Sequence, residues 1–210
     1  MAIEFKTEQE KFWSGEFGDQ YIERNCDESI IAANTALFSR ILSRTDSVKS
    51  VIEFGANIGL NLIAIKRLLP NIDLSAIEIN PKAVEELNKI DCVKTYPQSI
   101  LEYEVDFQRD FVLTKGVLIH INPGMLPVAY DLMYRTSSRY ICVIEYYNPT
   151  PVEVDYRGHR ERLFKRDFAG ELMDNYDDLR LLDYGFVYRR DNNFIYGDEN
   201  WFLLEKQCAK

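Results

Sequence analysis

The sequence predicts a doubly wound α/β fold, and three observations support this prediction. Short apolar runs alternate with helical patterns between residues 50 and 145, an arrangement that gives a parallel sheet. A glycine-rich turn separates the first apolar run from the helix that follows it. Two extended runs close the chain and predict an antiparallel hairpin, so the expected sheet has seven strands and is mostly parallel.

Each element up to residue 96 has its own signal. The segment 12–21 combines aromatic residues with glycines, which predicts a packed loop laid across the domain, and a helical pattern follows at 28–43. Val51, Ile52 and Phe54 supply apolar bulk for a first strand at 50–54 that is buried on both faces. The other elements of this part are strands at 74–79 and 92–96 and helices at 60–69 and 81–89.

The later elements are predicted in the same way. Apolar residues at 111–113 and 117–119 predict one long fourth strand over 110–119. Pro123 suits the first turn of a helix over 123–134. A fifth strand is expected at 140–145, a basic segment at 156–166 leads into a helix that ends near 176, and the closing hairpin comprises 179–189 and 201–206.

Composition favours one soluble domain over 1–210, with an N-terminal extension over 1–45 and an insertion over 146–176. The 210 residues are 46% hydrophobic and 28% charged, and no stretch approaches the roughly 20 apolar residues of a membrane span. The amino terminus lacks the basic and apolar blocks of a signal peptide, so a cytoplasmic protein is expected. The net charge of −9 argues against binding to nucleic acid and favours small molecules.

The cysteines predict neither a metal site nor disulfides. Cys26, Cys92, Cys142 and Cys208 are widely spaced, with no C-x-x-C pair and only two histidines in the chain. We therefore expect four reduced thiols and no bound metal.

The turn over 53–61 carries the strongest functional signal. Glycines there remove side chains where backbone approaches a ligand, but their spacing is not the G-x-G-x-x-G of a dinucleotide site. The run resembles the E-x-G-x-x-x-G signature of class I S-adenosylmethionine (SAM) methyltransferases, which implies a Rossmann-like fold, SAM as cofactor and S-adenosylhomocysteine (SAH) as product. The resemblance assigns Gly55, Ala56, Asn57 and Gly59 to the turn near the methionine moiety, and Glu53 to hydrogen bonding around the amino group or the loop.

Two further segments are expected at the same nucleoside. Glu78 ends the second predicted strand, where a carboxylate could accept both ribose hydroxyls, although a strand-end acid is also commonly just exposed to solvent. Ile79 would lie along the adenine face. The adenine edge is usually met by the loop after the third strand, where Gln98, Ser99 and Ile100 are the candidates, with ordinary loop polarity as the alternative.

His120 is the candidate catalytic residue. It stands at the end of the predicted fourth strand, and the near-neutral pKa of histidine suits a base that accepts a proton from an acceptor hydroxyl or amine. The alternative is a partly buried histidine with a backbone hydrogen bond. Asn122-Pro123 has a weak likeness to the N-P-P-[YF] motif of amino-group methyltransferases, but Gly124 and Met125 depart from it, so a helix-start proline is favoured.

The insertion supplies the candidate acceptor site. Arginine pairs with carboxylate or phosphate through two parallel hydrogen bonds, so the basic segment suits an anionic small molecule, and the alternative is a solvated basic helix face. Arg157 and Arg160 would project the same way if a helix began near Gly158. Tyrosines could stack on the acceptor or simply pack. The candidate acceptor-binding residues are Tyr147, Asn148, Tyr156, Arg157, His159 and Arg160.

A narrower resemblance spans nearly the whole chain. The segments 12–25, 53–61, 114–123, 145–149 and 163–171 are similar to those of the pseudaminic acid biosynthesis-associated methylases. This resemblance implies methyl transfer to oxygen or nitrogen of a nonulosonic acid or nucleotide-sugar intermediate of surface glycan biosynthesis. A protein- or RNA-modifying methyltransferase and a non-catalytic SAM-binding protein are the alternatives. The sequence does not predict the oligomeric state.

Overall fold

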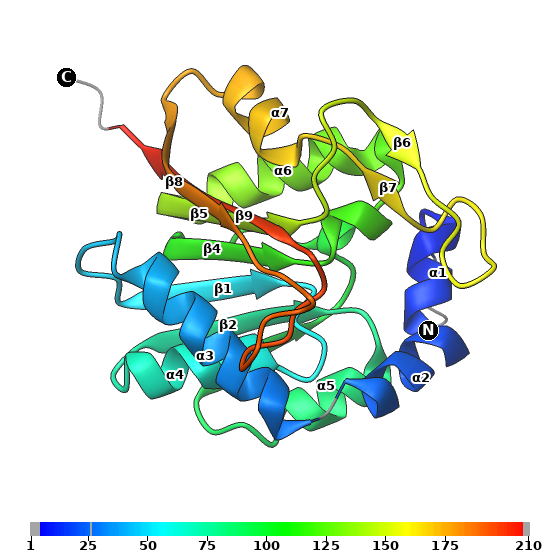
Figure 1. The fold of residues 1–210 in the computed structure, drawn as a ribbon, viewed down its shortest axis with the longest axis horizontal. Coiled ribbons are helices and arrows are strands. Elements are labelled where there is room, and N and C mark those ends of the chain that lie inside the picture. The colour runs from blue at the N-terminus through cyan, green and yellow to red at the C-terminus, as the bar shows by residue number, and fades with distance from the viewer. Residues whose placement is uncertain (1–4, 26, 208–210) are drawn as a thin grey trace.

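A mixed sheet of seven strands forms the centre of the protein (Figure 1). The computed structural model describes residues 5–25 and 27–207. The strands, in sheet order, are β3 (Val93–Pro97), β2 (Asp73–Glu78), β1 (Ser50–Phe54), β4 (Arg109–Lys115), β5 (Ser137–Glu145), β9 (Asn200–Lys206) and β8 (Leu179–Phe186). The first five are parallel, and β9 runs antiparallel to both β5 and β8. The predicted doubly wound sheet with a C-terminal hairpin is confirmed.

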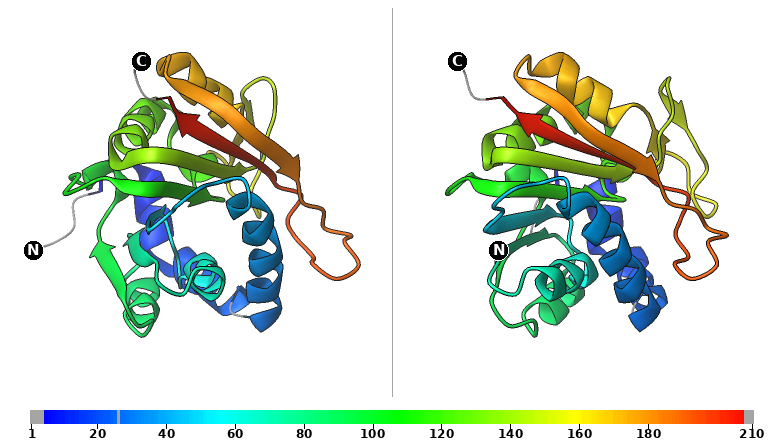
Figure 2. Two further views of the ribbon diagram at one scale, coloured as in Figure 1. Left: turned by 90° about the vertical axis from the view of Figure 1, so that its left-hand side faces the viewer. Right: turned by 60° about the vertical axis from the view of Figure 1, so that its left-hand side comes forward.

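Helices cover both faces of this sheet (Figures 1 and 2). One face carries α3 (Glu28–Leu42), α4 (Leu60–Leu68) and α5 (Pro81–Leu87), and the other carries α6 (Leu126–Thr136) and α7 (Phe168–Asn175). Successive strand residues enter opposite cores, so Phe111 and Leu113 pack with α3 and α4 while Val112 packs with α6. The near-continuous apolar strands of the sequence follow from this two-sided burial.

Residues 12–21 of the N-terminal extension lie in two helices, where a packed loop was predicted, whereas the predicted helix at 28–43 is present as α3. Helices α1 (Glu8–Ser14) and α2 (Glu16–Arg24) meet at Gly15 and lie beyond the carboxyl ends of the parallel strands (Figure 1). A capping box starts α1, because the Thr7 side chain accepts from the Glu10 backbone N–H while the Glu10 carboxylate accepts from the Thr7 N–H. Gly15 therefore separates two helices and does not mark a loop.

The predicted fourth strand is too long at its carboxyl end. The strand stops at Lys115, Gly116 adopts a left-handed conformation with φ +64°, and a 3-10 helix, η2, spans Leu118–His120. The apolar residues 117–119 suggested continued strand, but Leu118 and Ile119 are buried in a turn. A second 3-10 helix, η3 (Pro123–Met125), precedes α6, and a third, η1 (Ile100–Glu102), follows β3.

The basic segment is not helical, so the helix considered near Gly158 does not form. Two short strands, β6 (Val152–Glu153) and β7 (Phe164–Lys165), pair antiparallel. Between them Tyr156 and His159 exchange backbone hydrogen bonds across a tight turn in which Arg157 and Gly158 have φ of +50° and +84°. Two left-handed residues in succession suit a hairpin turn and cannot start a helix, so α7 begins only at Phe168.

Two of the four cysteines are described. Cys92 is exposed and Cys142 is buried, and both are free thiols, whereas Cys26 and Cys208 lie outside the described residues. Within residues 5–25 and 27–207, no group of His, Cys, Asp and Glu side chains is arranged to hold a metal ion. None of the helices in the described ranges is both long enough and apolar enough to cross a membrane.

Candidate active site

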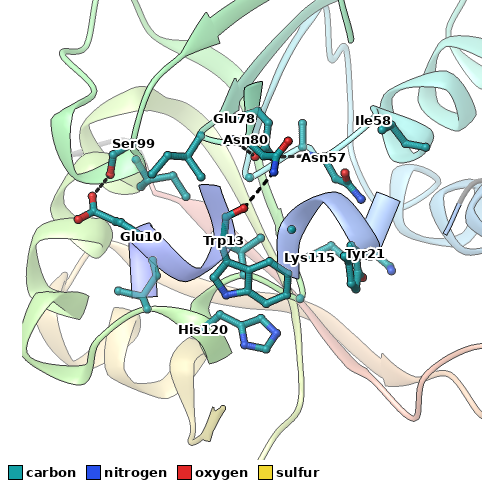
Figure 3. Close-up of a pocket in the computed structure, with 18 of the residues that line it drawn as sticks. Glu10, Trp13, Tyr21, Asn57, Ile58, Glu78, Asn80, Ser99, Lys115 and His120 are labelled. Carbon is teal, nitrogen blue, oxygen red and sulfur yellow. Dashed lines mark hydrogen bonds between the residues drawn. The ribbon is translucent and has the colours of Figure 1, made fainter. Parts of the chain in front are cut away.

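A cavity of about 220 Å³ lies at the carboxyl ends of β1, β2 and β4, where the strand order reverses direction (Figure 3). Ligands of doubly wound sheets bind at such a switch point. Of the predicted cofactor and catalytic residues, those that line the cavity are Gly55, Ala56, Asn57, Glu78, Ile79, Gln98, Ser99, Ile100 and His120. Glu53 and Gly59 are not among the lining residues.

The turn after β1 is shaped by left-handed backbone. Gly55, Asn57 and Gly59 have φ of +73°, +47° and +78°, and the N–H groups of Gly55 and Ala56 both donate to the Ile77 carbonyl, at 2.9 and 3.1 Å. A Cβ atom on Gly55 would lie 2.7 Å from a methyl carbon of Val117. Gly55 is therefore required both for its conformation and for close packing against the loop after β4.

The Glu78 carboxylate joins two turns of the site (Figure 3). It is buried, and its oxygens accept the backbone N–H groups of Asn57 and Asn80, each at 2.7 Å. Burial raises the pKa of Glu78, while the backbone hydrogen bonds from Asn80, Asn57 and Ile79 act to lower it. The solvent-exposed alternative is excluded. Asn57 and Asn80 each use one lone pair on a different oxygen, and Ile79 adds a third backbone contact, so at least one lone pair remains for a ligand hydroxyl.

Two side chains near the glycine turn, Glu53 and Asn61, have buried oxygen atoms without a hydrogen-bond partner in the protein. Glu53 is buried, and burial raises the pKa of its carboxyl to about 8, although the Asn61 side-chain N–H donates to it at 2.5 Å. Glu53 Oε2 and Asn61 Oδ1 are both buried and lack a protein partner. Asn61 lines the cavity, as does Lys115, whose Nζ is 3.3 Å from Glu199 Oε2. Neither Asn61 nor Lys115 was among the predicted site residues.

Helices α1 and α2 cover the cavity and are fastened to its rim (Figure 3). The Asn80 side-chain N–H group donates to the Trp13 carbonyl at 3.2 Å and to Asp19 Oδ1 at 2.9 Å. On the other side the Ser99 hydroxyl donates to the Glu10 carboxylate and accepts from the Leu101 N–H, so its own hydrogen bonds are satisfied within the protein. Glu10 and Trp13 line the cavity, and sequence analysis had missed both.

His120 lies in η2 with its ring between Trp13 and Tyr156, at centroid distances of 4.5 and 4.9 Å. Its Nδ1 is 2.5 Å from the Arg162 carbonyl oxygen. A carbonyl only accepts, so Nδ1 carries the proton and Nε2 has the free lone pair. Burial lowers the pKa of His120 to about 4, despite the opposing hydrogen bond to Arg162, which corrects the near-neutral pKa expected from the sequence. The neutral ring is the form present at pH 7.

The six candidate acceptor residues do not line the cavity. Tyr147 is 40% exposed beside Phe202, and the Asn148 side chain donates to the Thr150 carbonyl at 2.6 Å. Arg157 and Arg160 are exposed, with Arg160 Nε 3.9 Å from an Asp155 oxygen.

His159 and Tyr156 instead pack against the aromatic residues of α1 and α2. The His159 ring is 5.0 Å from that of Phe12, and the Tyr156 ring is 5.7 Å from that of Phe17. The insertion thus forms a second layer outside the N-terminal helices (Figure 1). Its residues contact three of the residues that line the cavity, namely His120, Trp13 and Gln9.

Comparison with known proteins identifies the fold. No protein-family model and no curated protein matches the chain. Among solved structures, 1,6-didemethyltoxoflavin-N1-methyltransferase of Burkholderia thailandensis with bound SAH is similar at 14% identity and a TM-score of 0.68, over 95% of this chain and 87% of that chain. Magnesium protoporphyrin IX methyltransferase of Synechocystis PCC 6803 with bound SAH is similar at 12% identity and a TM-score of 0.68, over 94% and 98%.

The plantazolicin methyltransferase BpumL with SAH is also similar, at 14% identity and a TM-score of 0.64, over 95% of this chain and 94% of that chain. The fold is that of class I SAM-dependent methyltransferases. At these identities the similarity establishes the architecture.

Proposed function

We propose that this protein is a SAM-dependent methyltransferase that transfers a methyl group to oxygen or nitrogen of a small acceptor. The observation that carries the proposal is the buried Glu78 carboxylate, which holds the glycine turn at the switch point of a methyltransferase fold. The similar structures named above contain SAH. A dinucleotide is disfavoured because the glycine spacing lacks the middle glycine that lets backbone approach a pyrophosphate.

The residues of the cavity fit SAM. Glu78 would accept the ribose hydroxyls, and Ile79, Gln98 and Ile100 would surround the adenine. Asn61 Oδ1, buried without a partner, is the acceptor that the ammonium of the methionine moiety needs, and Lys115 would face its carboxylate. When bound, SAM supplies an electrophilic methyl group on a sulfonium.

His120 would act as the base, and its tautomer supports this role. The Arg162 carbonyl holds the proton on Nδ1, so Nε2 is the nitrogen that would take a proton from the acceptor as the methyl group is transferred. Trp13 and Tyr156 pack on the ring and limit the access of water. The alternative for His120 was a structural role with a backbone hydrogen bond. That hydrogen bond is present, and it also fixes the tautomer that a catalytic base would need.

For the acceptor we propose an anionic sugar, namely a nonulosonic acid or a nucleotide-sugar intermediate. The resemblance to the pseudaminic acid biosynthesis-associated methylases supports this class. The proteins named above are, by their names, methyltransferases of small molecules or of plantazolicin, which supports a small acceptor. Within the described residues, Lys115 is the cationic side chain that lines the cavity. The insertion 146–176 would cover the acceptor from outside α1 and α2.

The two arginines of the insertion provide one test of this acceptor site. If Arg157 and Arg160 hold the acceptor anion when the insertion covers it, Arg157→Ala or Arg160→Ala raises the acceptor KM by an amount equivalent to about 1.5–3 kcal/mol for a charge-assisted hydrogen bond. Lysine at either position should restore the acceptor KM only partly, because an ammonium cannot form the two parallel hydrogen bonds of a guanidinium. SAM affinity measured by calorimetry should not change, because neither side chain lines the cavity. Normal acceptor kinetics in both alanine variants would show that the two arginines do not bind the acceptor.

The lowered pKa of His120 predicts an unusual pH profile. A base with a pKa of about 4 is already deprotonated throughout the range of pH 5 to 8, so kcat/KM should show no ionisation near 6.5 from this residue. Any loss of rate through protonation of His120 should appear only as the pH drops through about 4. Rates would be measured beside circular dichroism at each pH, to separate protonation from acid unfolding. A His120 ring that takes up a proton near pH 6.5 in the folded protein, as seen in its ¹⁵N signals, would contradict the buried, neutral ring.

The activity itself is tested with methyl-labelled SAM. The protein would be incubated with a metabolite extract and, separately, with the macromolecular fraction of the native cell, and the label followed by mass spectrometry. Label in a small anionic product is expected. Label in protein or RNA would favour the macromolecule-modifying alternative, and SAM binding without any transfer would favour the non-catalytic one.

A further inference from the structure

Glu145, the last residue of β5, is a buried acid with no role in the mechanism above. It is 2% exposed and does not line the cavity. Burial raises the pKa of its carboxyl to about 7, against the opposing effect of the backbone N–H groups that surround it. A buried carboxyl at the carboxyl edge of the sheet, one strand away from His120, needs an explanation.

The contacts of this carboxyl are nearly all with one neighbouring turn. Oε1 accepts the backbone N–H groups of Val117 at 3.0 Å and Leu118 at 2.9 Å, and Oε2 accepts that of Ile119 at 3.4 Å. The Thr114 hydroxyl adds a bond of 3.3 Å. Three successive N–H groups at the start of η2 are therefore capped by a side chain of the adjacent strand, since Val117 at the N-cap provides no cap of its own.

This turn forms one wall of the cavity. Gly116, Val117, His120 and Ile121 all line it, and the Val117 side chain abuts the space beside Gly55. The position of the turn thus sets both the location of the His120 ring and the fit of the glycine turn on the opposite side. Among the described residues, Glu145 provides the side-chain acceptor for all three N–H groups.

We propose that Glu145 is a positioning residue for methyl transfer: its carboxylate holds the turn 116–121 in the conformation that places His120 against the acceptor. The inference rests on the proposed function for the identity of the reaction, but its structural part does not. An acceptor-only group is required, because three donors converge on it. Glutamine at this position would direct an NH2 group or a single oxygen at the same donors and leave at least one N–H unsatisfied.

The test compares Glu145→Gln with Thr114→Val, which removes one hydrogen bond to the same carboxylate and leaves the three N–H bonds intact. Methyl transfer from labelled SAM into the metabolite extract should fall on the order of 10²-fold in Glu145→Gln, since a displacement of about 1 Å costs that much, and by much less in Thr114→Val. In a double-mutant cycle, His120→Ala/Glu145→Gln should be no slower than His120→Ala alone.

A spectroscopic measurement judges the inference without an acceptor. The chain has two histidines, so ¹⁵N spectra resolve His120 once His159→Gln assigns the other signal. The wild type should show the neutral tautomer protonated at Nδ1, and Glu145→Gln should show mixed tautomers. If Glu145→Gln does not fold, amide exchange in the wild type decides: the N–H groups of Val117, Leu118 and Ile119 should be as protected as those of β5.

These outcomes separate the two proposals. Absence of SAM binding and methyl transfer in the wild type would overturn the proposed function, while the histidine spectra and amide exchange still report on the turn. Normal turnover and an unchanged tautomer in Glu145→Gln would overturn the positioning role, as would fast exchange of the three amides in the wild type. Multiplicative losses in the double variant would show that Glu145 acts on something other than His120.

Discussion

Replacing His120 by alanine should lower methyl-transfer turnover by about 10²- to 10⁴-fold, the usual contribution of a general base. The physical reason is the free lone pair on Nε2, which the Arg162 carbonyl secures by holding the proton on Nδ1. SAM affinity, measured by calorimetry, should change little, because the proposed contacts to ribose, adenine and the methionine moiety come from other residues.

His120→Asn is the sharper variant. An asparagine amide can still donate to the Arg162 carbonyl and preserve the link to the insertion, but it has no basic nitrogen in the place of Nε2. Both variants should therefore be slow, and the asparagine variant should keep the wild-type unfolding midpoint more closely. An unchanged rate in either variant would show that His120 is structural. Loss of SAM binding together with turnover would show that the ring supports the cofactor cavity.

Replacing Glu78 by alanine should nearly abolish SAM binding. Two ribose hydroxyls that each donate to a carboxylate contribute on the order of 1.5–3 kcal/mol apiece, which corresponds to a dissociation constant raised roughly 10²- to 10⁴-fold. The substitution also removes the acceptor for the N–H groups of Asn57 and Asn80, so the glycine turn is no longer hydrogen-bonded to the end of β2. Calorimetry with SAM and with SAH measures the effect, and NAD should not bind the wild type.

Two further variants define what the Glu78 result means. Glu86→Ala removes an acid from the exposed surface of α5, where it pairs with Lys89, and should leave SAM affinity unchanged. Gly55→Val should weaken SAM binding as severely as Glu78→Ala, because its side chain would collide with Val117 and its φ of +73° is strained for a β-branched residue. Wild-type SAM affinity in Glu78→Ala, or tight binding of NAD without any response to SAM, would contradict the cofactor assignment.

The sequence predicts the strands well because their burial is two-sided. Apolar runs such as Val51 to Phe54 have one stable placement, between two helical layers, and the first three strands begin and end within one residue of their predicted positions. The fourth strand shows the limit of this argument. Leu118 and Ile119 are buried as expected, but Glu145, which lies 27 and 26 residues later in the chain, accepts the backbone hydrogen bonds of this turn. An apolar segment predicts burial, but it does not predict which groups accept the hydrogen bonds of its backbone N–H groups.

The two sides of the candidate site also differ in how well the sequence predicts them. The side of the cavity proposed to hold the cofactor is formed by short segments around Gly55, Glu78 and Ser99, so local sequence patterns are enough to predict that these residues lie together. Its cover depends on contacts between residues 61 to 89 positions apart, such as Asn80 with Trp13 and Ser99 with Glu10. The placement of the insertion outside α1 and α2 depends on equally distant contacts, and the helical reading of the basic segment failed because Arg157 and Gly158 adopt left-handed conformations.

The fastening of α1 and α2 also bears on how the protein is made. These helices leave the ribosome before their partners, which are Asn80, Ser99 and, through Gln9, the Glu161 carbonyl. During synthesis α1 and α2 must therefore wait, with their aromatic side chains exposed, until these later residues have followed. Ribosome-bound chains arrested before Asn80 should be cleaved by protease near Trp13, and chains released after Arg166 should resist. Equal resistance to the protease at both lengths would show that other contacts protect α1 and α2 before Asn80 is synthesised.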